Sequence, residues 1–240
     1  MPLFDEDVAF VQAVAFSSAT AAVMPAIIEY LQGLQLRGGR VLDVGCGAGA
    51  STAALASAGF RPIAVDVSKH LLARARTAAP NAEFHCASIF EFDIPPCEAI
   101  LALSEPLTYY APDVDADVVL QQFLRKAANA MRPGGPLIFD IISADGPSLD
   151  AKGWKAGDDW AILWETVEHP QERRLVRSIE TFRDQGDGYR RTREIHHVRL
   201  FSEQQIRDWL SAAGFEATVT TSYGPAPLLP RRLAFFASRR

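Results

Sequence analysis

Cysteine is scarce in this chain of 240 residues, which contains only Cys46, Cys86 and Cys97. The count is odd and the spacing differs from that of zinc-binding cysteines, so neither a disulfide framework nor a zinc centre is expected. Each cysteine adjoins a predicted strand, and we expect all three to be buried free thiols. Free thiols are typical of a reducing compartment, which predicts a cytoplasmic protein.

An excess of positive charge is also missing. The chain has 24 lysines and arginines against 29 aspartates and glutamates, which gives a net charge of −5. Because surfaces that bind nucleic acids are usually basic, we expect no nucleic-acid partner. Arginines do occur in adjacent pairs, which we expect on solvated faces: residues 173–174, 190–191, 231–232 and 239–240.

Long apolar runs are absent as well, since none approaches the roughly 20 residues that span a bilayer. Asp5, Glu6 and Asp7 are acidic, whereas a signal peptide begins with basic residues. We therefore expect neither a membrane partner nor a signal peptide. Apolar residues make up 48% of the chain and charged residues 22%, which is enough for a substantial core. We expect a single domain over residues 1–240.

One segment combines a strand, three glycines and a helix. Its apolar start, residues 41–44, predicts a buried strand, and the alanine-rich residues 50–58 predict a helix. Gly45, Gly47 and Gly49 lie between them. Glycines allow positive φ angles and let backbone N–H groups approach a ligand closely. The segment therefore predicts a nucleotide-type binding loop.

An acid stands at the end of the next predicted strand, residues 62–66. Asp66 lies 21 residues after Gly45, which is the spacing at which an acid reaches ribose hydroxyls. Two cofactor classes fit this geometry, namely a nicotinamide or flavin dinucleotide and S-adenosylmethionine. Asp43 favours the second, because a carboxylate there would repel a pyrophosphate but attract an α-ammonium group and a sulfonium.

The stretch Leu42–Gly49 (Leu-Asp-Val-Gly-Cys-Gly-Ala-Gly) closely resembles the glycine motif of class I S-adenosylmethionine-dependent methyltransferases. A second resemblance is Arg-Pro-Gly-Gly at residues 132–135, followed by an apolar strand that contains Asp140. The family resemblance implies S-adenosylmethionine as the cofactor and S-adenosylhomocysteine as its product.

The same resemblance implies a set of nine cofactor-binding residues: Asp43, Gly45 and Gly47 at the methionine part, Asp66 at the ribose, Val67, Ser88 and Ile89 at the adenine, and Cys46 and Ser104 also at the site. Ser88 stands where these methyltransferases usually carry an acidic or polar residue. A hydroxyl binds the adenine amine less strongly than a carboxylate would.

The order of the segments predicts an α/β fold with a Rossmann-like, seven-stranded, mostly parallel sheet that closes with a C-terminal antiparallel hairpin. Its expected parts are a helical arm at residues 1–38, a cofactor-binding core at 39–142, an antiparallel β insertion at 143–200 that covers the acceptor, and a helix and closing hairpin at 201–240. Within the insertion we expect three strands: residues 160–167, 175–182 and 189–200.

Methyl transfer is an in-line displacement, so proximity and orientation dominate, and a base is needed only if the acceptor must lose a proton. Tyr109, or its neighbour Tyr110, can place a ring over the sulfonium. Alternation along residues 189–200 places His196 on one face of a strand and His197 on the other. Either histidine can serve as the base near neutral pH.

Aromatic residues of the insertion are candidates for the acceptor pocket: Trp154, Trp160, Trp164 and Tyr189. No metal site is expected, because no second carboxylate joins Asp140 near the fourth and fifth strands. The sequence therefore predicts methyl transfer to an O or N atom of a small-molecule acceptor. The alternatives are an NAD-dependent oxidoreductase, which Asp43 and the closing hairpin disfavour, and a non-catalytic S-adenosylmethionine-binding module. A monomer and a homodimer both fit the sequence.

Overall fold

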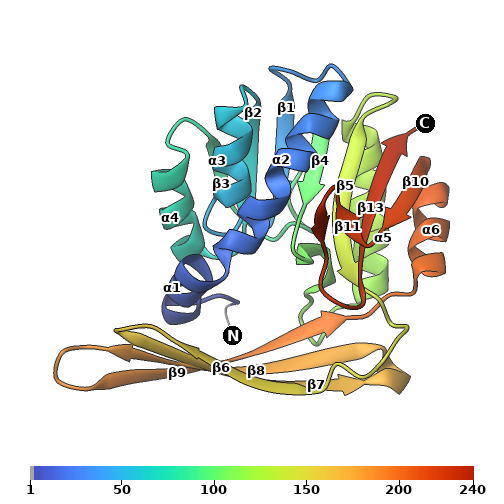
Figure 1. Cartoon of the computed structure of the whole chain (residues 1–240). Coiled ribbons are helices and arrows are strands. Elements are labelled where there is room, and N and C mark those ends of the chain that lie inside the picture. Colours follow the sequence, from blue (N-terminus) through green and yellow to red (C-terminus); the bar gives the residue numbers. More distant parts are fainter. Residues whose placement is uncertain (1–2) are drawn as a thin grey trace.

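A computed structural model describes residues 3–240, and its main element is a seven-stranded sheet (Figure 1). The strands of this sheet are β1 (Arg40–Val44), β2 (Arg61–Asp66), β3 (Glu83–Cys86), β4 (Ala99–Ala102), β5 (Pro136–Ile142), β10 (Phe215–Thr220) and β13 (Arg232–Arg239). Their order is β10-β13-β5-β4-β1-β2-β3. In this sheet β13 runs antiparallel to both of its neighbours, β5 and β10, and all the other pairs of strands are parallel. The predicted fold class is therefore confirmed.

Helices cover both faces of this sheet: α1 (Glu6–Ala15), α2 (Ser17–Gly33), α3 (Ala50–Ser57), α4 (Lys69–Ala78), α5 (Ala116–Ala130) and α6 (Glu203–Ala212). Alternation along β1 assigns its side chains to the two faces. Leu42 packs in the core beneath α5 and α6. Val41 packs in the core beneath α2 and α3. Asp43 shares the face of Val41 and so points toward α3.

The first two helices bury apolar residues inside the protein. In α1, Val8 and Val11 are buried, and in α2, Ile27 and Leu31 are buried. No single helix within residues 3–240 is long and apolar enough to cross a membrane. The bent pair α1–α2, with 54° between its helices, passes the same test of length and composition when its two parts are taken together.

A second sheet follows β5 and consists of four antiparallel strands in the order β6-β7-β8-β9. These are β6 (Ala151–Ala156), β7 (Trp160–His169), β8 (Arg174–Asp184) and β9 (Tyr189–Arg199). The expectation of three strands was wrong, since β6 is a fourth. Its sequence, Ala-Lys-Gly-Trp-Lys-Ala, has little apolar content because β6 is an edge strand that buries none of its residues.

The four-stranded sheet leaves and rejoins the main sheet at one point. Ser143 forms a β-bridge with Phe201, and the backbone N–H of Ala144 donates to the carbonyl of Phe201 at 2.9 Å. Figure 1 shows the sheet lying across the end of the main sheet where β5 finishes. Short elements complete the chain: β11 (Ser222–Tyr223), β12 (Ala226–Pro227) and 3-10 helices at Pro106–Thr108 and Pro170–Glu172.

The cysteines differ from the expectation at one position. Cys46 and Cys97 are buried free thiols, and burial raises the pKa of the Cys97 thiol to about 12. Cys86 is a free thiol but is exposed, so its predicted burial was wrong. The reason is its place at the end of β3, which is an edge strand of the main sheet.

One arginine pair is not on a solvated face as predicted. Only 3% of the Arg231 side chain is exposed, and it forms two bonds of 2.7 and 2.9 Å with Glu168 of β7. Arg231 also donates to the carbonyl of Ser143 from Nε and Nη2. This buried ion pair ties the segment before β13 to the four-stranded sheet.

We expect Arg231→Ala to lower the free energy of unfolding by about 3–5 kcal/mol, because it leaves the buried Glu168 carboxylate without its partner. Denaturant titration followed by circular dichroism measures this change. Arg173→Ala is the matched control, since Arg173 also has a positive φ (48°, against 63° for Arg231) but is exposed. An equal loss of unfolding free energy in the two variants would contradict the stabilising role of the ion pair.

Candidate active site

The glycine loop lies between β1 and α3 and is held against its neighbours. Gly45, Gly47 and Gly49 have φ angles of 65°, 55° and 88°. The backbone N–H groups of Gly45 and Cys46 both donate to the carbonyl of Val65, at 2.8 and 3.1 Å. A Cβ atom at Gly45 would lie 2.4 Å from Cβ of Pro106. The loop therefore packs directly on the turn that follows β4.

We expect Gly45→Ala to weaken the binding of S-adenosylhomocysteine at least tenfold, because the new methyl group must displace Pro106 and the loop with it. Gly59→Ala is the control, since Gly59 also has a positive φ (84°) but no atom lies within 4 Å of the added Cβ. Calorimetric titration of both variants separates the effect of the clash from that of the backbone angle. Comparable affinities would contradict the packing argument.

Asp66, at the end of β2, holds the glycine loop in place through hydrogen bonds. Its Oδ2 accepts from the backbone N–H of Gly47 at 2.9 Å, and its Oδ1 accepts from that of Ser68 at 2.8 Å. Burial raises the pKa of Asp66, against the lowering effect of these bonds. Each oxygen keeps capacity for a second bond, so the carboxylate is suited to accept from vicinal hydroxyls. Val67, next in the chain, is 48% exposed.

Asp43 faces the first turn of α3. Its Oδ2 accepts from the hydroxyls of Ser51 and Thr52 at 2.7 and 2.5 Å. Both bonds use one oxygen, so within residues 3–240 the Oδ1 atom retains the capacity to accept. Burial, together with the neighbouring charge of Asp66, raises the pKa of Asp43 to about 6.

The other predicted cofactor-binding residues lie at the same end of the sheet. Ser88 and Ile89 are partly exposed just beyond β3, and the carbonyl of Ser88 accepts from two backbone N–H groups that begin the following turn. The side chain of Cys46 is buried in a small apolar cluster with Leu72, and its Sγ donates to the carbonyl of Gly47 in the loop at 3.8 Å. Ser104 is exposed beyond β4.

Sequence reasoning missed Glu105, which follows Ser104. Both residues have positive φ angles, 66° for Ser104 and 64° for Glu105, and such conformations cost about 1–3 kcal/mol each. The Glu105 side chain is 3% exposed and lies 2.7 Å from Nη1 of Arg177 and 3.1 Å from Nη2 of Arg232. Burial raises the pKa of Glu105, but the two guanidinium charges outweigh it and lower the pKa overall.

Asp140 of β5 joins this cluster. Its Oδ1 accepts from the backbone N–H of Ser104 at 2.7 Å and from the hydroxyl of Tyr223 at 3.0 Å. Its Oδ2 lies 3.5 Å from Arg232. Burial raises the pKa of Asp140 to about 6. Within residues 3–240 no group of three or more His, Cys, Asp and Glu side chains is arranged to hold a metal ion.

Tyr109 stands between this cluster and the four-stranded sheet. Its hydroxyl accepts from Nη1 of Arg177 at 2.9 Å. Its ring meets those of Phe4 and His196 edge-on, with both centroids 5.8 Å away. Burial raises the pKa of Tyr109 to about 12. Its hydroxyl therefore keeps its proton near neutral pH.

The two candidate histidines lie on opposite faces of β9, as predicted. His196 is 1% exposed, and its Nε2 lies 2.7 Å from Oε2 of Glu194, which is also buried. His196 is directly opposite Arg177 in the sheet register. His197 lies on the outer face beside Tyr110, with 6.0 Å between the ring centroids. Burial, and to a smaller extent the charge of Arg174, lowers the pKa of His197.

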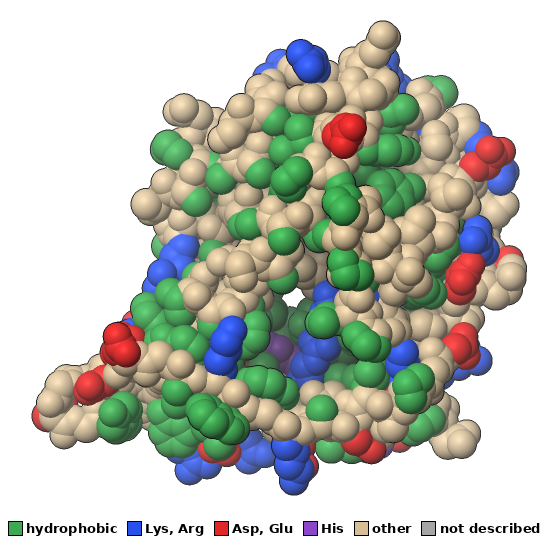
Figure 2. All heavy atoms as spheres, viewed as in Figure 1, with side chains coloured by type: hydrophobic (Ala, Val, Ile, Leu, Met, Phe, Trp, Pro, Cys, Tyr) green, Lys and Arg blue, Asp and Glu red, His purple; other side chains and the backbone are tan. Residues whose placement is uncertain are grey.

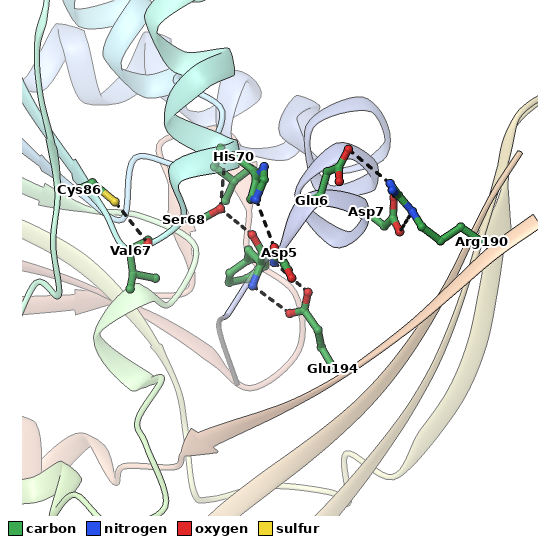
Figure 3. A network of polar contacts seen from close by, with 11 residues as sticks. Asp5, Glu6, Asp7, Val67, Ser68, His70, Cys86, Arg190 and Glu194 are labelled. Atoms are coloured by element: carbon green, nitrogen blue, oxygen red, sulfur yellow. Dashed lines mark hydrogen bonds and ion pairs between the residues drawn. The ribbon is translucent and has the colours of Figure 1, made fainter. Parts of the chain in front are cut away.

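Glu194 connects the start of the chain to this face (Figure 3). Its two oxygens accept from the backbone N–H groups of Phe4 and Asp5, both at 2.8 Å. The carbonyl of Phe4 accepts from the hydroxyl of Ser68 at 2.5 Å. The segment before α1 therefore bridges the inner face of β9 and the turn that follows Asp66.

A cavity of about 340 Å³ separates the main sheet from the four-stranded sheet. Figure 2 shows an opening between these two parts, with basic side chains and a histidine inside it. The cavity is lined by Ile142, Leu149, Trp164, Leu175, Arg177 and Arg232, among others.

Of the four aromatic residues proposed for an acceptor pocket, one lies at this cavity. Trp164 lines it, whereas Trp154 is 74% exposed on the outer face of the sheet. Trp160 and Tyr189 line a separate hollow near one end of the four-stranded sheet. The structure thus brings Trp164 together with Arg177 at the cavity, while Trp160 shares only an apolar cluster with Trp164.

Comparison with known proteins agrees with this arrangement. Residues 41–135 match the family model of a methyltransferase domain. A protein named as a methyltransferase from Geobacillus sp. (strain WCH70) is 26% identical over 217 residues, which cover 84% of each chain. The ubiquinone biosynthesis O-methyltransferase of Coxiella burnetii is 31% identical over 133 residues, and the match spans about half of each chain, 50% of this one and 51% of that relative.

Solved structures share the fold. An S-adenosylmethionine-dependent methyltransferase from Clostridium acetobutylicum ATCC 824 has a TM-score of 0.78 and 21% identity, with 95% of this chain and 94% of that chain covered. A sugar N-methyltransferase from Streptoalloteichus sp. ATCC 53650 has a TM-score of 0.76 and 23% identity, with 98% and 92% covered. Residues 41–135 thus match a methyltransferase domain, and the whole chain has the fold of S-adenosylmethionine-dependent methyltransferases.

Proposed function

We propose that the protein transfers the methyl group of S-adenosylmethionine to an O or N atom of a small molecule that binds in the cavity beneath the four-stranded sheet. The observation that carries this proposal is the buried pair of His196 and Glu194, which stands on the inner face of that sheet and is bridged to the Asp66 turn by Phe4. The acidic net charge and the size of the cavity favour a small acceptor over a nucleic acid.

The loop residues fit the cofactor. Asp66 has oxygens able to accept from the ribose hydroxyls, and Asp43 offers one carboxylate oxygen toward an ammonium group. Val67, Ser88 and Ile89 border the adenine in this assignment. When bound, the cofactor supplies a methyl group activated by the positive charge on its sulfur. The protein has to align the acceptor with that methyl group and exclude water.

His196 is the base in this proposal. Its Nε2–H donates to the Glu194 carboxylate, which leaves Nδ1 to take the proton that the acceptor loses. Glu194 is a positioning residue, since it fixes the ring and its tautomer. Tyr109 keeps its proton near neutral pH, so it contributes its ring and hydroxyl to the wall of the site rather than acting as a base.

Residues 143–200 act as the acceptor cover within a single methyltransferase domain in this proposal. Their inner face contributes Trp164, Arg177 and His196, while residues 39–142 contribute the cofactor loop. His197 lies on the outer face, which disfavours it as the base.

Binding of S-adenosylhomocysteine is expected to weaken as the pH falls through about 6. Asp43 takes up a proton in this range, and the ligand's ammonium group favours the ionised carboxylate. The free energy of unfolding of the ligand-free protein depends on pH in the opposite direction. A carboxyl group whose pKa is raised by folding stabilises the ligand-free protein at low pH, and this contribution is lost as the pH rises through 6.

Calorimetric titration at pH 7.5 and pH 5 should show a loss of about tenfold in affinity, because one proton competes with the ligand. In Asp43→Asn the dependence on pH should be smaller and the affinity at pH 7.5 lower. A wild-type affinity that stays constant down to pH 5 would rule out Asp43 as the ammonium-binding group.

The proposed function is tested by two measurements on the purified chain. Calorimetry with S-adenosylhomocysteine and, separately, with NAD identifies the cofactor, and only the first ligand is expected to bind. A panel of small hydroxyl- and amine-bearing acceptors is then incubated with S-adenosylmethionine, and the release of S-adenosylhomocysteine is measured. Binding without turnover on any acceptor would favour the non-catalytic alternative, and binding of NAD alone would favour an oxidoreductase.

A further inference from the structure

We propose that the acceptor carries a carboxylate on an apolar body, and that Arg177 and Arg232 bind this carboxylate at the inner wall of the cavity. This inference rests on the proposed function and names the class of substrate for the same site. Both arginines line the cavity, although one comes from β8 and the other from β13.

The arginines retain donors for a ligand. Within residues 3–240, Arg177 forms its side-chain hydrogen bonds through Nη1 alone, to Glu105 and Tyr109. Its Nε and Nη2 atoms have no hydrogen-bond partner there, and neither is among the completely buried unpaired atoms. A carboxylate is matched by such a pair of N–H groups, which point in the same direction on one guanidinium.

The acids beside the arginines hold them in place without using all of their donors. Glu105 holds Arg177 and Arg232 through one oxygen, Oε1. Arg232 lies 3.5 Å from Asp140, whose pKa is raised by burial to about 6. Two guanidinium groups therefore face two acids, while the Nε and Nη2 donors of Arg177 stay without a partner within residues 3–240. A carboxylate adds one negative charge to this balanced cluster, whereas a phosphate adds up to two and suits it less well.

Apart from Thr166, the remaining wall of the cavity is apolar. Ile142, Leu149, Trp164 and Leu175 line it, and its volume of about 340 Å³ is at the small end of ligand pockets. A polar, multiply hydroxylated acceptor would lose hydrogen bonds to water against these side chains without replacing them. An aromatic or aliphatic body would be stabilised by the same contacts.

The anion site is next to the proposed base. Arg177 is directly opposite His196 in the register of β8 and β9, and it also donates to the Tyr109 hydroxyl. A carboxylate held by Arg177 thus anchors one end of the acceptor near His196. The O or N atom to be methylated is then carried on the same small molecule, within reach of the base. Such anchoring supplies the orientation that methyl transfer needs.

The test is calorimetry on the full chain saturated with S-adenosylhomocysteine. The probes are benzoate, 3-phenylpropionate and hexanoate, the primary amide of each, and phenyl phosphate. We expect at least one acid to bind at least tenfold more tightly than its amide. Arg177→Gln should weaken that binding at least tenfold, whereas Arg191→Gln, on the outer face of the same sheet, should leave it unchanged.

Substitution of Arg177 or Arg232 leaves Glu105 with only one of its two guanidinium partners, so the double variant Glu105→Gln/Arg232→Gln is included, which removes one charge of each sign. Arg177→Lys keeps the charge but removes the paired donors. Thermal unfolding checks that each variant folds.

Equal binding of acids and amides, tighter binding of phenyl phosphate, no binding of any acid, or full binding in Arg177→Gln would each overturn the inference. If the wild-type chain fails to bind S-adenosylhomocysteine, the proposed function itself fails. If S-adenosylhomocysteine binds normally but no acid binds, only the inference that the acceptor carries a carboxylate is refuted.

Discussion

Replacing His196 with glutamine is expected to lower the turnover of methyl transfer by about 10²- to 10⁴-fold, which is the usual contribution of a positioned general base. Glutamine fills similar space and can still hydrogen-bond Glu194, so the wall of the site should persist. Since His196 is not assigned to cofactor binding, the affinity for S-adenosylhomocysteine should stay within about twofold of the wild type. The measurement is kcat with an acceptor identified in the panel, together with calorimetry.

His197→Gln is the matched control, because the next residue of β9 lies on the outer face and should leave kcat unchanged. Glu194→Gln should have a smaller effect than His196→Gln and should shift the acidic limb of the pH–rate profile, since Glu194 acts through the imidazole. A large loss in His197→Gln with normal turnover in His196→Gln would reverse the assignment of the base. Full activity in both variants would favour an acceptor that needs no base.

Replacing Asp66 with alanine is expected to weaken the binding of S-adenosylhomocysteine by roughly 100-fold, about 3 kcal/mol. Two effects add. The ribose hydroxyls lose a charged acceptor, and the backbone N–H groups of Gly47 and Ser68 lose the carboxylate that orders the loop. Calorimetry measures the affinity, and circular dichroism verifies that the variant is folded.

Asp66→Asn separates these two effects, because the amide oxygen can still accept one bond but carries no charge. Asp93→Ala is the control for the loss of an exposed acid elsewhere in the chain. Unchanged affinity in a folded Asp66→Ala variant would show that the acid has only a structural role at the end of β2.

The strand, loop and helix that form the glycine loop could be predicted because the sequence signals for them are local. The strand, glycines and helix of residues 41–57 lie next to one another in the sequence, and each has a distinct requirement for its residue types. Alternation along β9 also placed His196 and His197 on opposite faces, because the side-chain period of a strand is fixed.

The wall of the cavity between the two sheets was not predicted, because it depends on contacts between distant segments. Glu105 meets Arg177 and Arg232 across 72 and 127 residues of the sequence, and nothing local distinguishes it from a turn residue before Pro106. Arg231 looked like a solvated residue for the same reason, since its partner Glu168 is on another element. Strand β6 was missed because an exposed edge strand needs few apolar side chains.

The bridge between Ser143 and Phe201 has a consequence for how acceptor preference can change. A segment whose ends already meet can be exchanged for one of different length with little displacement of its neighbours. We therefore expect residues 143–200 to be exchangeable while the cofactor-binding residues stay in place. A chimera that joins a relative's segment at these two positions must also supply partners for the rest of the chain. It needs an acid opposite Arg231, as Glu168 is here, and an acceptor for the N–H groups of Phe4 and Asp5. The ion pairs of Arg177 with Glu105, Arg190 with Asp7 and Arg199 with Asp117 must be matched as well. We expect a chimera that preserves these contacts to keep its cofactor loop in place.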